Sequence, residues 1–335
     1  IKASYFPYQL EFKKPSGTSR GILTYKKIWI VKLWNEENPE VFGLGECNPL
    51  VGLSIDDRDD FEEELKKICE NINDFIDVES YEFPSIRFAI ETAHKDLING
   101  GKRILFDNEF SRGEKGIVIN GLVWMGSKED MSKQIAEKIE QGFKCIKLKI
   151  GAIDFETELA LLKSIRDQYS ESDIEIRVDA NGAFTAHDAL KKLEHLAKFK
   201  LHSIEQPIKQ GQVEVMAKLC KVTPLAIALD EELIIHQRKE EKEILLKEIQ
   251  PQYIILKPSI VGGWKASEEW IASAEKLNIN WWITSALESY IGLNAIAQWT
   301  AELKTKTPQG LGTGGLYTNN FDSKLKIKGQ ILTHF

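Results

Sequence analysis

Short runs rich in β-branched residues recur through the last two thirds of the chain, and each ends in a charged or polar residue. These end residues follow one another at intervals of 25 to 30 positions: Lys149, Asp179, Glu205, Asp230, Lys257 and Ser285. An amphipathic stretch follows each run, and strands that alternate with helices form right-handed βαβ units with a parallel sheet. One such unit of a barrel takes about 30 residues, because eight units span about 250. The spacing therefore predicts a (β/α) barrel.

The first hundred residues follow a different pattern. Strand-like runs at 27–34 and 40–46 are joined by loops rich in Gly, Pro and Ser, and helical stretches follow at 57–75 and 85–97. We therefore predict an α/β protein with three parts: an α+β domain (1–105), a modified TIM barrel of the form (β/α)7β (106–315), and a C-terminal segment that returns to the first domain (316–335). The seventh barrel strand ends at Ser285, which leaves residues 310–317 for the closing strand.

Composition narrows the class of protein. Acidic residues outnumber basic ones by 51 to 44, and no dense run of Lys and Arg could follow a phosphate backbone, so nucleic acid is not an expected partner. The longest apolar runs are far shorter than the roughly 20 residues that cross a bilayer, so no membrane segment is expected. The first residues lack the features of a signal peptide, which favours the cytoplasm. Four cysteines lie far apart without a CxxC motif and are expected to be buried thiols: Cys47, Cys69, Cys145 and Cys220.

Alternation along each strand decides which side chains face the barrel interior. In residues 145–150 the two lysines share one face and the aliphatic residues share the other, and the aliphatic face must meet the helices. The same parity turns five strand-end side chains inward: Lys149, Asp179, Glu205, Asp230 and Lys257. We expect these groups to converge at the C-terminal mouth, where barrel enzymes carry out their chemistry.

The carboxylates of Asp179, Glu205 and Asp230 end successive strands and should lie close together. Two negative charges about 4 Å apart repel by about 4 kcal/mol at an effective dielectric constant near 20, so three such groups need a cation. An all-oxygen ligand set, with no His at a matching strand end, suits Mg²⁺, with Mn²⁺ as a substitute. The alternative for each acid taken singly is a solvated strand end or a salt-bridge partner.

Lys149 and Lys257 end strands on opposite sides of the carboxylates, and Lys147 lies beside Lys149. A lysine accepts a proton only when its pKa is lowered, and burial beside a second ammonium group and a divalent cation acts in that direction. With Lys149 neutral, the three acids, Mg²⁺ and two ammonium groups leave a net charge of +1. Such a site favours an anion, and favours still more the dianionic enediolate formed by removing a proton α to a carboxylate. A Schiff-base lysine is the rival assignment, but it leaves the three acids without a role.

Weaker features have both a functional and an ordinary interpretation. Gly262-Gly263 could open a helix whose N-terminus binds an anion, or could form a tight turn. The stretches at 15–21 and 43–50 could be ordinary turns. Arg20, in the first of these, could bind a distant acidic group of the substrate when the loop closes, or could lie at the surface.

At these positions the sequence resembles the enolase superfamily. The matching motifs are Lys147-Leu148-Lys149, Val178-Asp179-Ala180-Asn181, Ile204-Glu205-Gln206-Pro207, Leu229-Asp230-Glu231 and Leu256-Lys257-Pro258. Residues 85–93 and 45–49 are similar to the family's N-terminal capping domain, so the resemblance covers nearly the whole chain. It implies a lysine base and an enediolate held by magnesium.

Lysines on the second and sixth barrel strands are similar to the muconate lactonizing subgroup, and no His ends the seventh strand as it would in mandelate racemase. Residues 284–293 and 310–317 most resemble the o-succinylbenzoate synthases of menaquinone biosynthesis. The Asp-x-Asp pair usual in dipeptide epimerases is missing from Gly312-Thr313-Gly314.

This resemblance implies dehydration of 2-succinyl-6-hydroxy-2,4-cyclohexadiene-1-carboxylate to o-succinylbenzoate, a hydro-lyase reaction. It implies that Lys149 takes the ring proton and returns it to the departing hydroxyl, and that Lys257 stabilises the intermediate as a cation. Lys147, Ser285 and Arg20 are then expected to bind the substrate.

Two other functions stay open: an N-acylamino acid racemase or dipeptide epimerase on the same scaffold, and a non-catalytic barrel. The non-catalytic barrel is disfavoured because an idle scaffold has no need to bury five converging charges. The expected partner is a small-molecule carboxylate, and a homo-oligomer is also left open.

Overall fold

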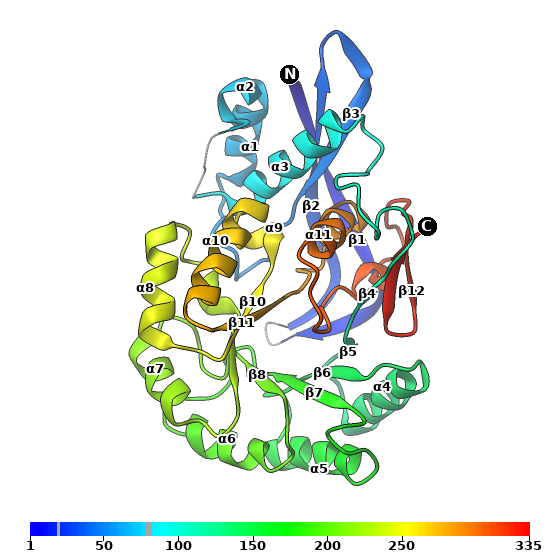
Figure 1. Ribbon diagram of the computed structural model, residues 1–335. Coiled ribbons are helices and arrows are strands. Elements are labelled where there is room, and N and C mark those ends of the chain that lie inside the picture. The colour runs from blue at the N-terminus through cyan, green and yellow to red at the C-terminus, as the bar shows by residue number, and fades with distance from the viewer. Residues whose placement is uncertain (19–20, 78–81) are drawn as a thin grey trace.

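The computed structural model describes residues 1–18, 21–77 and 82–335. An α+β capping domain lies above a parallel barrel, and the C-terminal segment lies beside both (Figure 1). Among the described residues, no helix combines the length and the apolar character needed to span a membrane.

Seven parallel strands form the barrel wall in the order β11-β10-β9-β8-β7-β6-β5. Their bounds are β5 Gly121–Val123, β6 Cys145–Lys149, β7 Glu175–Asp179, β8 Ser203–Glu205, β9 Ile227–Leu229, β10 Tyr253–Leu256 and β11 Asn280–Ile283. The register pairs Lys149 with Asp179 and Asp179 with Glu205. Residues that lie 26 to 30 positions apart in the sequence therefore become neighbours at one end of the barrel.

The barrel closes through bridges rather than through an eighth full strand. Gln309 and Gly310 form isolated parallel bridges with Ile119 and Thr284. The closing strand predicted at 310–317 is thus reduced to residues 309 and 310, and the chain then forms the 3₁₀ turn η2 (Gly314–Leu316). The first barrel segment contains two short strands, β4 (Ile117–Val118) and β5.

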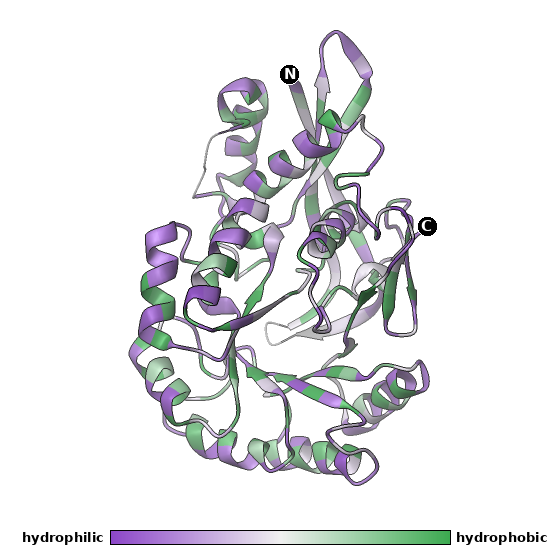
Figure 2. Cartoon of the chain, in the orientation of Figure 1, coloured by the Kyte–Doolittle hydropathy of each residue, from purple (hydrophilic) through white to green (hydrophobic). Residues whose placement is uncertain are grey.

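Helices cover the outside of the barrel. They are α4 Lys128–Glu140, α5 Phe155–Arg166, α6 Ala189–Ala197, α7 Val213–Val222, α8 Lys239–Ile249, α9 Pro258–Val261, α10 Gly263–Lys276 and α11 Tyr290–Glu302, with the 3₁₀ turn η1 Glu231–Leu233 after β9. Strand residues such as Ile146 and Val178 pack with helix residues in one large core, whereas Ala228, Ile255 and Trp282 form a separate cluster. This division confirms the predicted parity. Figure 2 shows mainly hydrophobic barrel strands and helices that carry both colours.

The capping domain contains the antiparallel sheet β1 (Lys2–Thr18), β2 (Gly21–Asn35) and β3 (Asn38–Cys47), with α1 (Phe61–Glu70), α2 (Ile72–Phe75) and α3 (Pro84–Ile98). Helix α3 packs so closely on β3 that glycine is required there. A β-carbon at Gly43 or Gly45 would lie 1.9 or 1.8 Å from a carbonyl oxygen of α3. This part of the stretch at 43–50 is therefore a strand and not an ordinary turn.

The C-terminal segment contacts both parts of the molecule. Tyr317 forms a bridge with Phe12 of β1, and the N–H of Thr318 donates to the carbonyl of Glu11 at 2.9 Å, so the chain returns to the capping domain here. The hairpin of β12 (Leu325–Lys328) and β13 (Ile331–His334) pairs instead with β4, at the start of the barrel.

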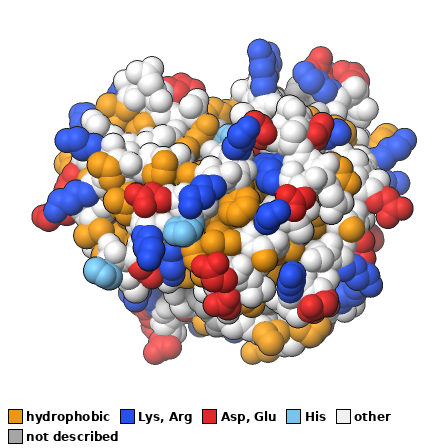
Figure 3. Space-filling view, turned by 90° about the horizontal axis from the view of Figure 1, so that it is seen from below, with side chains coloured by type: hydrophobic (Ala, Val, Ile, Leu, Met, Phe, Trp, Pro, Cys, Tyr) orange, Lys and Arg blue, Asp and Glu red, His pale blue; other side chains and the backbone are white. Residues whose placement is uncertain are grey.

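The cysteines agree with the expectation from the sequence, since all four are buried and free. Basic and acidic side chains are intermingled on the face turned away from the capping domain (Figure 3).

Candidate active site

Three buried carboxylates meet at the C-terminal mouth of the barrel. Asp179 and Glu205 are the last residues of β7 and β8, and Asp230 directly follows β9. Each is at most 2% exposed, and one oxygen of each lies within 4.8 Å of the other two. The structure thus brings together the three acids that the strand-end spacing selected.

The oxygen atoms of this triad suit a metal ion. Glu205 Oε1 and Asp230 Oδ1 are buried and have no hydrogen-bond partner within the described ranges. A buried polar atom without a partner costs about 1–3 kcal/mol, so these oxygens are strong acceptors without a donor. Three carboxylates form the hard, all-oxygen donor set that Mg²⁺ prefers. The residues present therefore fit the predicted cation.

Lys147 and Lys149, on β6, face the triad from one side. Lys147 Nζ donates to Asp179 Oδ2 at 2.9 Å and also to Glu205 Oε2. Lys149 Nζ donates to the same oxygen of Asp179 at 2.9 Å and to Asn181 Oδ1 at 2.8 Å. Parallel pairing of β6, β7 and β8 therefore places two lysine nitrogens against two of the acids.

Lys257 faces the triad from another side, directly after β10. Its Nζ donates to Asp230 Oδ2 at 2.5 Å. Burial alone would lower the pKa of Lys257, but attraction to Asp230 and Glu231 outweighs it, so the pKa lies above its ordinary value. Lys257 is therefore held as an ammonium ion.

Charge coupling sets the protonation of the remaining groups. Burial alone would lower the pKa of Lys147, but attraction to the three acids raises it well above its ordinary value. Burial alone would raise the pKa of Asp179, but Lys147 and Lys149 hold it well below its usual range. Burial raises the pKa of Glu205 to about 7, because repulsion by Asp179 and Asp230 offsets the attraction of Lys147.

A cavity of about 90 Å³ opens at this mouth. Lys149 and Lys257 both line it, together with Ser285 and the apolar side chains of Trp124 and Leu287. Two lysine side chains on the wall of one small cavity, with Asp179 beside them, form an arrangement that can transfer protons on a bound anion.

Several lining residues were missed in the sequence analysis, although the same parity could have found some of them. Asn120, Leu122 and Trp124 alternate along the first barrel segment and all line the cavity. Asn181, two residues beyond Asp179, has a left-handed φ of 44°. Its side chain accepts from Lys149 and donates to Glu231 Oε1 at 2.9 Å, so it orients the lysine.

The structure treats the two other predicted substrate-binding residues differently. Ser285 lines the cavity, and its hydroxyl donates to the carbonyl of Gly310 at 3.2 Å and lies 2.6 Å from the hydroxyl of Thr313. Arg20 lies outside the described residues.

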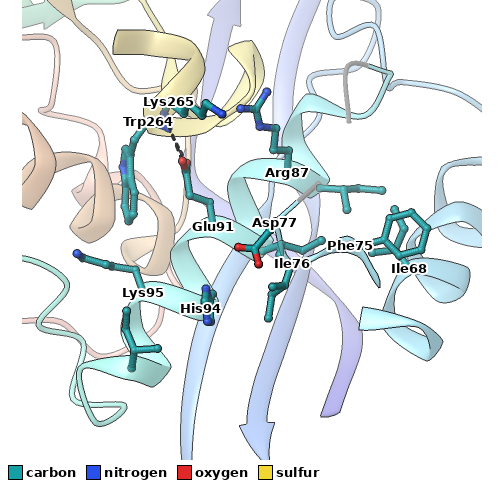
Figure 4. A pocket seen from close by; sticks show the side chains of 13 residues that line it. Ile68, Phe75, Ile76, Asp77, Arg87, Glu91, His94, Lys95, Trp264 and Lys265 are labelled. Atoms are coloured by element: carbon teal, nitrogen blue, oxygen red, sulfur yellow. Dashed lines mark hydrogen bonds between the residues drawn. The ribbon is translucent and has the colours of Figure 1, made fainter. Parts of the chain in front are cut away.

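The Gly262-Gly263 pair is explained by a contact between domains. Both residues have positive φ, of 100° and 90°, and α10 begins at the second. Glu91 of α3 accepts from the N–H of Trp264 at 2.6 Å and of Lys265 at 3.2 Å (Figure 4). The anion at this helix N-terminus is therefore a side chain of the capping domain.

Glu91 also lines a cavity of about 340 Å³ between the capping domain and α10. Burial raises the pKa of Glu91 to about 7, although the two N–H groups oppose this. None of the three acids of the triad lines this larger cavity, so the smaller cavity at the mouth is the candidate active site.

Comparisons with known proteins agree with this assignment. Residues 130–332 match the family described as "Enolase C-terminal domain-like". The chain is 45% identical to an o-succinylbenzoate synthase from Desulfotalea psychrophila, over 99% of this chain and 98% of that protein. The crystal structure of MenC from Desulfotalea psychrophila superimposes with a TM-score of 0.88 and 42% identity, covering 99% of both chains. A hydrophobic dipeptide epimerase from Enterococcus faecalis is 28% identical over 74% of this chain and 70% of its own length.

Proposed function

This chain belongs to the enolase superfamily and, within it, to the o-succinylbenzoate synthase family, and from that premise we propose how its residues divide the work of the reaction. The enzyme is a lyase that acts on a small molecule. The reaction is the dehydration of 2-succinyl-6-hydroxy-2,4-cyclohexadiene-1-carboxylate to o-succinylbenzoate. The observation that carries the proposal is the placement of Lys149 and Lys257 on the wall of one small cavity, against three buried acids.

Lys149 is the base. As a neutral amine it takes the ring proton α to the carboxylate, and the resulting ammonium ion returns that proton to the hydroxyl group that leaves as water. The C–O bond breaks on the face from which the proton was taken, because one lysine serves both steps. Hydrogen bonds to Asp179 and Asn181 hold the nitrogen at the cavity wall.

Lys257 remains protonated through the reaction. Its raised pKa, due to Asp230 and Glu231, supports this role. An ammonium ion beside the ring stabilises the negative charge that develops when the proton is removed, and it also attracts the π-face of the aromatic product. Lys147 and Ser285 are proposed to bind the carboxylate of the substrate.

Asp179, Glu205 and Asp230 would hold Mg²⁺, and Mn²⁺ is proposed to substitute for it. When bound, such a cation supplies positive charge to the substrate carboxylate and so makes the α-proton more acidic.

The test of this function is a direct assay with purified protein and Mg²⁺. We expect the cyclohexadiene substrate to disappear as o-succinylbenzoate forms, with a spectroscopic change that marks the new aromatic ring. The proposal is overturned if the protein forms no o-succinylbenzoate with either Mg²⁺ or Mn²⁺.

Epimerisation is the second candidate, and the 28% identity to the dipeptide epimerase is the observation that favours it. Two lysines on opposite sides of an α-carbon could remove its proton from either face. Exchange of the α-proton of both enantiomers of an N-succinylamino acid or a dipeptide in deuterium oxide, without dehydratase activity, would favour this alternative.

We also propose that the enzyme works in the cytoplasm, where reducing conditions suit four free, buried cysteines. Association of several copies stays a prediction, which light scattering of the purified protein can test.

A further inference from the structure

One wall of the catalytic cavity is a strained loop. Residues 284–289 connect β11 to α11, and Ser285, Ala286 and Leu287 line the cavity. Leu287 has a φ of 64°, in the left-handed region. A non-glycine residue there costs roughly 1–3 kcal/mol and persists only when its surroundings hold it in place.

The groups that hold this loop come mainly from the capping domain. Lys26 of β2 donates from Nζ to the carbonyl of Ala286 at 2.7 Å and to the carbonyl of Leu287 at 3.2 Å. Asn48 Nδ2 also donates to the carbonyl of Ala286, at 2.9 Å. Tyr317 Oη donates to the carbonyl of Leu287 at 2.7 Å. Both carbonyl groups of the cavity wall are thus fixed from outside the barrel.

Lys26 is buried, with 7% of its surface exposed, and it is an unexpected residue for such a place. Burial lowers the pKa of Lys26 to about 8, against the attraction of Glu288 and Glu46. An apolar side chain would fill the same space without this desolvation cost, so the ion is a poor choice for stability alone. Only a hydrogen-bond donor, however, can pair with the carbonyl groups of Ala286 and Leu287 and so hold this loop in place.

We propose that Lys26 is a positioning residue that sets the apolar wall of the substrate cavity through the carbonyl groups of Ala286 and Leu287. The inference rests on the proposed function, because it assigns this wall to the part of the substrate that does not react. Lys149 and Lys257 act on the reacting carbon, and the wall formed by Leu287 is left to contact the rest of the molecule. The capping domain thereby shapes the cavity through buried polar contacts as well as through Leu50, which lines it.

The test compares Lys26→Met, which keeps the length but removes the donor, with Lys26→Arg, which keeps a donor. Lys27→Met is the matched control, because Lys27 is the next residue of β2 and its side chain is 52% exposed. Calorimetric titration with o-succinylbenzoate in the presence of Mg²⁺ measures the dissociation constant, which depends on the contacts that the ligand makes with this wall. We expect Lys26→Met to weaken binding about tenfold, which corresponds to about 1.4 kcal/mol, Lys26→Arg to recover part of this loss, and Lys27→Met to bind like wild type.

Steady-state kinetics give the readout that a purely structural role would not move. The KM of Lys26→Met should rise about as much as the dissociation constant while kcat changes little, because contacts away from the reacting carbon are lost equally in ground and transition states. Binding of o-succinylbenzoate at the wild-type dissociation constant by a Lys26→Met variant that melts at a lower temperature would overturn the proposal.

If Lys26→Met does not fold, Tyr317→Phe tests the same wall by removing one donor to Leu287, and wild-type affinity in that variant overturns the proposal. Failure of the proposed function is a separate result, because it appears in the wild-type protein as a lack of o-succinylbenzoate formation. A wild-type protein that does not bind o-succinylbenzoate overturns both.

Discussion

Buried carboxylates in two parts of the molecule differ in their partners. At the seam between the capping domain and the barrel, Glu46 accepts from the N–H and hydroxyl of Ser289 and from the N–H of Gly292, and Glu288 accepts from Ser259 and from the N–H of Ala286. At the mouth, Glu205 and Asp230 each keep one buried oxygen that no described donor reaches. Both places are enclosed, but of the two it is the mouth that calls for a cation.

Burial alone does not separate the two places. It raises the pKa of Glu46 at the seam to about 7, even though hydrogen bonds from Ser289 oppose this, and it raises the pKa of Glu205 at the mouth to about 7 as well. The two places differ in whether the chain itself supplies a hydrogen-bond donor to each carboxylate oxygen. Buried carboxylates whose oxygens are all paired can hold two parts of a protein together, whereas a cluster of three with unpaired oxygens is a candidate for metal binding.

The largest expected effect comes from removing one charge at the mouth. Glu205→Gln should lower kcat by at least about 10³. The substitution replaces a charged metal ligand by a neutral one, and this removes several kcal/mol of transition-state stabilisation. Steady-state assays at saturating Mg²⁺ measure this loss. The fold should survive, because the substitution relieves repulsion between Glu205 and its two acidic neighbours.

Glu91→Gln is the matched control for that variant, since it makes the same change at the seam, where backbone N–H groups already pair with both oxygens. It should keep kcat close to the wild-type value. Equal losses in the two variants would remove the distinction between mouth and seam.

The next effect separates the two lysines of the mouth. Lys149→Arg should reduce dehydration by about 10² to 10⁴, because a guanidinium group cannot act as a base at neutral pH. Lys257→Arg should retain substantial dehydration, because it keeps the positive charge that the reaction needs. Initial rates of o-succinylbenzoate formation decide between them, and equal and complete loss in both variants would instead favour a two-base epimerase.

A smaller effect concerns stability at the seam. The pKa of Glu91 is raised from its ordinary 4.5 to about 7, so the folded state binds the proton more tightly than the unfolded state between these values. The tighter proton binding stabilises the folded state fully below about pH 4.5, and this contribution to the free energy of unfolding is lost as the pH rises through 7. It amounts to at most about 3 kcal/mol, and to less to the extent that water reaches the partly exposed side chain of Glu91.

Glu91→Gln removes this titration, so its free energy of unfolding relative to wild type should improve steadily from pH 5 to pH 8. Chemical denaturation of both proteins across that range measures the difference, and other titrating groups cancel in the comparison. Parallel stability curves for the two proteins would show that Glu91 does not titrate as described.

The smallest expected effect concerns Arg20, whose role is predicted from sequence alone. Arg20→Ala should raise the KM for the succinyl-bearing substrate and change kcat less, because binding of the distant carboxylate is lost equally in ground and transition states. Kinetic constants identical to those of wild type would assign Arg20 to the solvated surface.

The barrel and its mouth could be predicted because strand parity and a nearly constant interval are properties of the sequence itself. Lys149, Asp179 and Glu205 are in register for that reason. The seam could not be predicted in this way. Lys26 meets Ala286, and Glu46 meets Ser289, across more than 240 residues of chain, and no local pattern marks such a contact. The predicted closing strand, 310–317, begins one residue after the observed bridges begin. Gln309 and Gly310 form these bridges without a β-branched run that would mark them in the sequence.

The central claim is that the three acids of the mouth bind a divalent cation on which the dehydration depends. It is tested most directly by assaying the enzyme on its cyclohexadiene substrate after complete removal of metal with EDTA, and again after Mg²⁺ is restored. The predicted result is no detectable o-succinylbenzoate without metal and full recovery of turnover when Mg²⁺ is added. Undiminished turnover in EDTA would contradict the claim.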